Sequence, residues 1–183
     1  LMTIAGDSCE YNLLTKWAKD FDCQGFSTCE VGVRAGLGSK IIMDNCKNSL
    51  IHIGIDPYGN LKYQHYDNES PYTSDYTDEM RDKLLEDMAQ YGSKFQLANM
   101  KDYEFMAQPE YNTTYAFVHF DGPHKTENVL TESIWFANHI PNKARFVFDD
   151  YPKYNMQLVR DCLKPFGFEI LGSGDNKICL EKK

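Results

Sequence analysis

The residues best suited to chemistry are acids that directly follow short apolar runs. Asp121 follows Tyr115–Phe120, and Asp149 and Asp150 follow Ala144–Phe148. If these runs are neighbouring strands of a parallel sheet, the three carboxylates converge at one edge of that sheet. Three like charges held together are costly unless they are protonated or neutralised by a cation. Oxygen ligands without clustered thiols or imidazoles favour Mg²⁺, Mn²⁺ or Ca²⁺ over zinc.

His124, three residues after Asp121, is the candidate for proton transfer. A metal ion would lower the pKa of a bound hydroxyl group, and a histidine titrating near neutrality could then accept its proton. The alternatives are a turn at Asp121, which begins Asp-Gly-Pro, and a solvent-facing His124 at a helix start. The other histidines belong to no motif and are assigned structural roles: His52, His65, His119 and His139.

The Asp149-Asp150 pair also has structural alternatives. Asp149 could be a buried acid paired with Arg145 or Lys143. Asp150 precedes Tyr151-Pro152, where a helix is expected to begin, so it could cap that helix. Capping does not exclude a metal at the same carboxylate.

A glycine-rich turn, Glu30-Val-Gly-Val-Arg-Ala-Gly-Leu-Gly-Ser39, follows the first expected strand. Bare backbone followed by a helix N-terminus suits a nucleotide-like ligand. Gly32, Gly36 and Gly38 do not have the spacing of a dinucleotide fingerprint, because Val33 and Arg34 stand where its second glycine belongs. Arg34 is expected either to pair with Glu30 or to reach the carboxylate of a cofactor.

A second acid, Asp56, closes the next apolar run, Leu50–Ile55. An acid at the end of the second strand suits the ribose hydroxyls of an adenosine moiety. Tyr58–Tyr76 then carries five tyrosines and no clean periodicity. Such a long loop is predicted to be a lid or a substrate-contacting insertion.

Strands alternate with helices over most of the chain, which predicts an α/β fold with a mainly parallel sheet covered on both faces. Strands are expected at 28–33, 50–55, 94–98, 115–120, 144–148, 168–171 and 177–180, the last two as an antiparallel hairpin. Helices are expected at 8–21, with Ser8 as a cap, and at 39–46, 77–91, 126–139 and from Pro152 to about Pro165, with Thr77 capping the third. The 183 residues are expected to form one domain, with residues 1–24 as an N-terminal helical segment.

In this order the motifs resemble those of class I S-adenosylmethionine-dependent methyltransferases. The turn from Glu30 to Ser39 resembles their first motif. Phe117-Val-His-Phe-Asp-Gly-Pro-His124 and Phe146-Val-Phe-Asp-Asp-Tyr151 resemble the D-G-x-H and D-D patterns of small metal-dependent O-methyltransferases, including sugar and macrolide types. The resemblance runs from about Thr28 to the C-terminus.

This resemblance implies a Rossmann-like methyltransferase sheet, S-adenosylmethionine as cofactor and a divalent cation, Mg²⁺ first. It assigns cofactor binding to Glu30, Gly32, Arg34, Gly36, Gly38, Ser39, Asp56, Asp121 and, near the adenine, Asp102 with Lys101 as a weaker candidate. It assigns the metal to Asp121, Asp149 and Asp150. His124 and Asp121 are then the catalytic pair, acting on a small hydroxylated acceptor such as a sugar.

Composition excludes several other classes. The net charge is −8 with no Lys/Arg stripe, so nucleic acid is not an expected partner. No run is long enough for a membrane helix and no signal-like stretch opens the sequence, which predicts a cytoplasmic protein without membrane contact. The six cysteines form no Cys-x-x-Cys pair and are expected to be reduced thiols. A homodimer through the N-terminal helix is left open.

Two other functions remain in view. A nicotinamide-dependent oxidoreductase would use a similar sheet, but the glycine spacing and a Tyr-x-x-x-Lys pair are missing. A non-catalytic S-adenosylmethionine-binding module would keep the turn and act through protein contacts.

Overall fold

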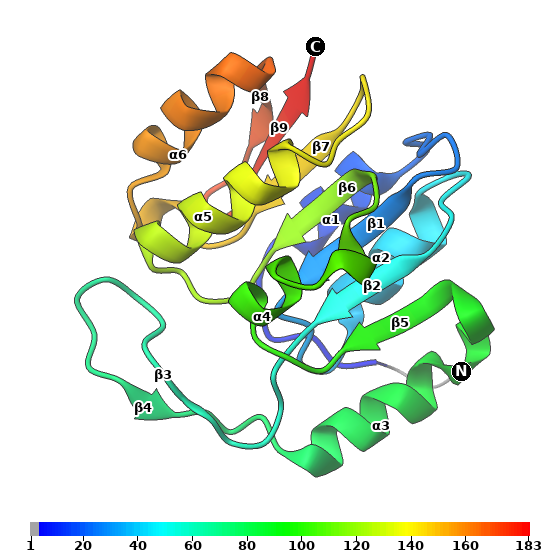
Figure 1. Ribbon diagram of the computed structural model, residues 1–183, viewed down its shortest axis with the longest axis vertical. Coiled ribbons are helices and arrows are strands. Elements are labelled where there is room, and N and C mark those ends of the chain that lie inside the picture. The colour runs from blue at the N-terminus through cyan, green and yellow to red at the C-terminus, as the bar shows by residue number, and fades with distance from the viewer. Residues whose placement is uncertain (1–3) are drawn as a thin grey trace.

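The computed structural model describes residues 4–183 and is built around a seven-stranded mixed sheet (Figure 1). The strands lie in the order β5 (Phe95–Ala98), β2 (His52–Ile55), β1 (Ser27–Val31), β6 (Tyr115–Phe120), β7 (Arg145–Phe148), β9 (Ile178–Lys182) and β8 (Phe168–Ser173). The first five are parallel, and β9 is antiparallel to both β7 and β8. The predicted α/β class and the C-terminal antiparallel hairpin are confirmed.

Helices cover both faces of the sheet (Figure 1). One face carries α1 (Tyr11–Ala18), α2 (Leu37–Asn45) and α3 (Asp78–Met88), and the other carries α4 (Asp102–Met106), α5 (Thr126–Ala137) and α6 (Met156–Leu163). Every residue of β1, β2 and β6 is buried, as expected for parallel strands between two helical layers. Among residues 4–183, no helix has the length and apolar character needed to cross a bilayer.

The strand register brings the sequence-predicted acids to one edge. Val31 pairs with both Ile55 and Phe120, and Phe120 pairs with Phe148, so these four strands end level with one another. The residues that follow the four strands therefore emerge side by side: Gly32, Asp56, Asp121 and Asp149. This edge is where open α/β sheets bind their ligands.

Two predicted helix starts differ from the structure. The first helix begins at Tyr11 without a side-chain cap, and the Ser8 hydroxyl bonds to Asp149 instead, so the Ser8 cap was wrong. The helix expected from Pro152 is a short 3₁₀ turn, η3 (Tyr151–Lys153), followed by α6, whose cap is Asn155. Asp150 makes no capping bond. The predicted Thr77 cap of α3 is confirmed by its bond from the Met80 N–H.

The tyrosine-rich segment, residues 58–76, contains a short antiparallel hairpin of β3 (Lys62–Tyr63) and β4 (Tyr72–Thr73). It lies across the carboxyl edge of the sheet and is anchored at the start of α5 (Figure 1). The His124 N–H donates to the carbonyl of His65 at 2.7 Å, and Asp67 accepts bonds from the Thr126 N–H and hydroxyl at 3.0 and 2.6 Å. Asp67 thus supplies, from the segment, the cap that α5 lacks in its own sequence.

Candidate functional site

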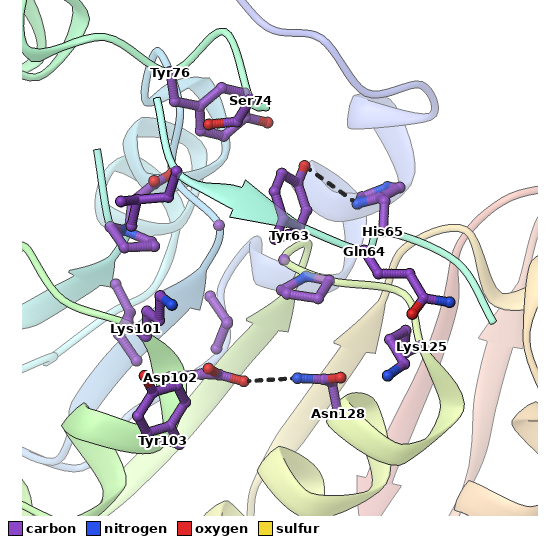
Figure 2. A pocket seen from close by; sticks show the side chains of 18 of the residues that line it. Tyr63, Gln64, His65, Ser74, Tyr76, Lys101, Asp102, Tyr103, Lys125 and Asn128 are labelled. Carbon is purple, nitrogen blue, oxygen red and sulfur yellow. Dashed lines mark hydrogen bonds between the residues drawn. The ribbon is translucent and has the colours of Figure 1, made fainter. Parts of the chain in front are cut away.

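A cavity of about 310 Å³ opens at the carboxyl edge of the sheet. Its walls come from the ends of β1, β2 and β6, from residues 57–76, and from the first turns of α4 and α5 (Figure 2). Four sequence-predicted residues and the weaker candidate Lys101 line it: Gly32, Asp56, Asp102, Asp121 and Lys101. Glu30, Arg34, Gly36, Gly38, Ser39, His124, Asp149 and Asp150 lie outside its wall.

Asp56 is the buried acid at the end of β2. Its Oδ2 accepts the N–H groups of Val33 and Arg34 at 3.0 and 2.9 Å, whereas its Oδ1 has no hydrogen-bond partner among the described residues. Burial raises the pKa of Asp56 to about 7, although the two N–H groups work to lower it. An unpartnered carboxylate oxygen at a cavity wall is suited to accept a ligand hydroxyl.

Gly32 permits the close approach of β1 and β6 at the cavity. Its φ is +82°, and a Cβ atom there would overlap the backbone carbonyl of Asp121. Bare backbone at this point leaves space for a ligand above the strand ends.

Glu30 faces away from the cavity. Its carboxylate accepts the Ser39 hydroxyl and lies 2.8 Å from His119 Nδ1, and a Cβ at Gly38 would overlap it. Ser39 also bonds to His52 Nε2 at 2.9 Å. Glu30, Gly38 and Ser39 therefore hold the start of α2 against the sheet and offer no surface to a ligand in the cavity.

Arg34 does not pair with Glu30. It makes ion pairs with Asp7 at 2.6 Å and Asp75 at 3.4 Å, and its guanidinium lies 5.3 Å from the ring centre of Tyr76. Arg34 thus ties the glycine turn to the N-terminal segment and to the tyrosine-rich segment. The sequence alternative of pairing with Glu30 was wrong.

The first turns of α4 and α5 form the far wall. Asp102 accepts a bond from Asn128 Nδ2 at 3.3 Å, and Lys101 lies over the ring of Tyr103 at 5.7 Å (Figure 2). Asp102 offers a carboxylate and Tyr103 a flat aromatic face at this end of the cavity.

The carboxyl groups of Asp121 and Asp149 contact each other and share a hydrogen bond. Burial and the neighbouring charge of Asp149 raise the pKa of Asp121 well above its usual range. Burial works to raise the pKa of Asp149 too, but the hydrogen bond with Asp121 and the ammonium of Lys177 lower it. Asp149 is therefore the ionised member. Its pairing with Arg145 or Lys143 was wrong, because the partner is Lys177 and Arg145 pairs with Glu181.

Asp150 belongs to a different cluster. Its Oδ2 accepts the Tyr66 hydroxyl and lies 3.2 Å from His124 Nδ1, and Lys153 approaches from outside. Burial works to raise the pKa of Asp150, but His124 and Tyr66 outweigh it and lower the pKa.

His124 is only 2 % exposed, so the solvent-facing alternative was wrong. Its Nε2 lies 3.9 Å from Asp121 Oδ1, and neither ring nitrogen makes a hydrogen bond within residues 4–183. His124 thus stands between the Asp121 and Asp150 carboxylates.

The three carboxylates assigned to a metal do not form one cluster among the described residues. Possible ligand atoms come within 4.8 Å of one another in three groups, and none of these groups holds all three carboxylates: Glu30–His119–Asp121, Asp121–His124–Asp149 and His65–His124–Asp150. The buried ammonium of Lys177 already forms an ion pair with the Asp149 carboxylate. A second cation beside that ammonium would be repelled, so this donor set does not fit the predicted divalent ion.

The fold has clear relatives among solved structures, although no family model and no curated protein sequence matches the chain. A protein from Corynebacterium glutamicum superposes with a TM-score of 0.67 at 16% identity, over 97% of this chain and 82% of that one. A putative methyltransferase from Streptococcus mutans, solved with S-adenosylhomocysteine, gives 0.60 at 10% identity, over 97% and 100%. The chain has the class I methyltransferase fold.

Another similar structure is magnesium protoporphyrin IX methyltransferase from Synechocystis with bound S-adenosylmethionine. It gives a TM-score of 0.55 at 13% identity, over 93% of this chain and 76% of that one. At sequence identities this low, structural similarity establishes the fold and nothing more specific. The site must be judged from this chain's own residues.

Several residues of the site carried no functional assignment from sequence. Tyr63 and His65 line the cavity from the tyrosine-rich segment, which had been singled out only as a whole. Lys177 had no motif. Its one signal is a lysine placed directly before a buried apolar strand, where a charged side chain needs a partner.

Proposed function

We propose that the chain is an S-adenosylmethionine-dependent methyltransferase acting on a hydroxyl group of a small acceptor. The observation that carries the proposal is Asp56 Oδ1, a buried, unpartnered acceptor at the wall of a cavity beside the glycine turn. In the cofactor complex this oxygen would accept a ribose hydroxyl. Asp102 and Tyr103 would face the adenine, and Gly32 would leave room for the amino-acid part. S-adenosylmethionine and S-adenosylhomocysteine in similar folds support the same choice.

Bound cofactor would supply the electrophilic methyl group, and the protein would supply position and a proton acceptor. Methyl transfer is an in-line displacement, so holding the acceptor oxygen in line provides most of the acceleration. Asp121 is the acid at the cavity wall, and beside the ionised Asp149 it already carries a proton. We therefore propose that Asp121 takes up the acceptor's proton as it passes its own proton to His124, whose Nε2 lies 3.9 Å from Asp121 Oδ1. No step requires a metal ion.

The acceptor is proposed to be a sugar hydroxyl or a hydroxyl on an aromatic ring. Tyr63 and Tyr76 in the cavity wall offer faces for stacking against either, and Gln64 and Ser74 offer polar contacts (Figure 2). With these walls, residues 57–76 act as the cover of the site.

Calorimetry with S-adenosylhomocysteine and with NAD tests the cofactor. We expect one S-adenosylhomocysteine per chain and no heat from NAD. Binding of NAD alone would favour the oxidoreductase and end this proposal.

Turnover is tested separately, as S-adenosylhomocysteine produced from a pool of hydroxylated acceptors. Asp121→Asn should lose most of the rate and keep cofactor binding, with Asp161→Asn on the outer side of α6 as control. Tight cofactor binding without product from any acceptor would favour the non-catalytic module.

A further inference from the structure

Lys177 is a fully buried lysine next to the reactive edge of the sheet. Its side chain has 0 % exposure, and its Nζ donates to Asp149 Oδ1 and to Ser8 Oγ, the latter at 2.8 Å. A buried ammonium is tolerated only when it is paired and hydrogen-bonded. Asp149 provides that partner.

The backbone around Lys177 is held by an acid from the other end of the chain. Glu10 accepts the N–H groups of Asp175, Asn176 and Lys177 at 2.8, 2.9 and 2.7 Å. The turn between β8 and β9 is therefore fixed against the start of α1. Lys177 enters the site from a rigid backbone.

Asp149 has no free oxygen for a metal ion. Asn176 Nδ2 joins Lys177 on Oδ1 at 2.8 Å, and the Ser8 hydroxyl donates to Oδ2 at 2.9 Å. With Asp121 in contact on the remaining side, the hydrogen-bonding capacity of this carboxylate is taken up by protein groups.

The same ammonium connects the site to the glycine turn. Lys177 Nζ lies 3.4 Å from His119 Nε2, and His119 Nδ1 lies 2.8 Å from Glu30. Because Nε2 faces an ammonium, it must act as the acceptor, so the ring proton is on Nδ1 and points to Glu30. A chain of buried polar groups thus runs from Asp149 to the start of α2.

We infer that Lys177 supplies, from within the fold, the positive charge that the sequence pattern assigns to a metal ion, and that Asp149 positions Asp121 instead of binding metal. The Asp121 and Asp149 carboxyls share one proton, so together they carry one negative charge. The buried ammonium of Lys177 neutralises that charge, and no further cation is needed. The inference rests on the proposed function in one respect, that the acceptor approaches Asp121. Otherwise it concerns the free protein.

The test is Mn²⁺ binding and thermal unfolding of the free protein. The wild type should bind no Mn²⁺ at millimolar concentration by calorimetry, and its unfolding temperature should not change with Mn²⁺ or with chelator. Lys177→Met removes the charge at nearly constant length and should lower that temperature by about 10 °C, since one charge of a buried pair is left alone. Mn²⁺ should recover part of the loss.

Two further variants make the result specific. Asp149→Asn combined with Lys177→Met removes both charges and should unfold at a higher temperature than Lys177→Met alone. Lys153→Met removes an exposed lysine that pairs with Asp150, and it should change neither the unfolding temperature nor the absence of Mn²⁺ binding.

Three outcomes would overturn the inference: one Mn²⁺ bound by the wild type and lost in Asp149→Asn, an unchanged unfolding temperature for Lys177→Met, or no recovery in the double variant. A Lys177→Met chain that does not fold leaves the double variant to decide. Failure of S-adenosylhomocysteine to bind would count against the proposed function alone, because none of these measurements uses the cofactor.

Discussion

Asp56 combines two opposing demands on one carboxyl group. The glycine turn holds its Oδ2 through two N–H groups, and burial leaves Oδ1 without a partner. A buried unpartnered acceptor is unfavourable in the free protein, and a ligand hydroxyl would relieve that cost. Binding of the proposed cofactor would therefore remove an unfavourable feature of the free protein at this carboxylate.

Asp56→Asn should weaken S-adenosylhomocysteine binding by about tenfold or more, because a charge-assisted hydrogen bond is replaced by a neutral or reversed one. In the wild type the affinity should fall as the pH drops below 7, where Asp56 takes up its proton, and the variant should show a flat profile. Calorimetry at about pH 6 and about pH 8 measures both effects. Parallel pH profiles of affinity in the two proteins would contradict the proposed contact between Asp56 and the ribose.

A side chain at position 32 would be unfavourable for two separate reasons, the positive φ of Gly32 and the overlap of an added Cβ with the Asp121 carbonyl. Gly32→Ala should cost about 1–2 kcal/mol for the left-handed backbone and about 1–3 kcal/mol more for the overlap. Gly25→Ala is the matched control, because Gly25 has φ +80° and nothing within 4 Å of an added Cβ. Urea unfolding of both variants separates the two terms, and equal losses would show that the contact with the Asp121 carbonyl is unimportant.

At the scale of elements, the strands and long helices were predictable because their patterns are local. The run Tyr115–Phe120 gives β6 with no change of bounds, and Asp78–Met88 follows its Thr77 cap. Burial between two helical layers demands apolar runs, and the level ends of these strands place the acids after them together. The position of Asp56 and Asp121 at one cavity therefore followed from sequence.

Pairings between distant segments were not predictable in the same way. Lys177 and Asp149 are 28 positions apart, and Ser8 and Asp149 are 141 apart. Nothing local marks Lys177 as the partner of Asp149 in place of Arg145 or Lys143. The division of the three carboxylates into two clusters depends on these contacts, and so the predicted metal site could not be judged before the fold was known.

The tyrosine-rich segment is bonded to the first residue of α5, Thr126, through Asp67. Asp67→Ala removes both bonds to Thr126 and should release the segment, so trypsin should cut faster at Lys62. S-adenosylhomocysteine should bind a few-fold more weakly, since residues 61–65 line the cavity. Glu69→Ala, an exposed change in the same segment, is the control. If trypsin cuts both variants at the wild-type rate, Asp67 is not the anchor.

At the scale of the whole molecule, several buried acids lie at the site, and their titration makes the stability of the fold depend on pH. Asp56 and Asp121 have pKa values raised by burial, whereas those of Asp149 and Asp150 are lowered by their partners. The two kinds of acid affect stability oppositely. Acids with lowered pKa lose their stabilising contribution as the pH falls, and acids with raised pKa lose theirs as the pH rises.

For Asp56 the sign and window can be given. Its pKa rises from 3.8 in the unfolded chain to about 7 in the folded one, so its contribution is fully present below 3.8 and is lost as the pH rises through 7. The cost above pH 7 is at most about 4 kcal/mol. Asn keeps an oxygen for the Val33 and Arg34 N–H groups and carries no charge, but it leaves its own N–H₂ unpartnered.

Asp56→Asn should therefore be more stable than the wild type above pH 7, by about 1–2 kcal/mol, and similar to it near pH 4. Urea unfolding across that range, without cofactor, is the measurement, and Asp161→Asn on the exposed side of α6 is the control. A variant that is more stable but binds S-adenosylhomocysteine more weakly would place the destabilising group and the binding group at one carboxylate. A variant less stable at every pH would mean that the hydrogen bonds from Val33 and Arg34 to the carboxylate stabilise the fold more than the buried charge destabilises it. Asp56 would then not destabilise the free protein.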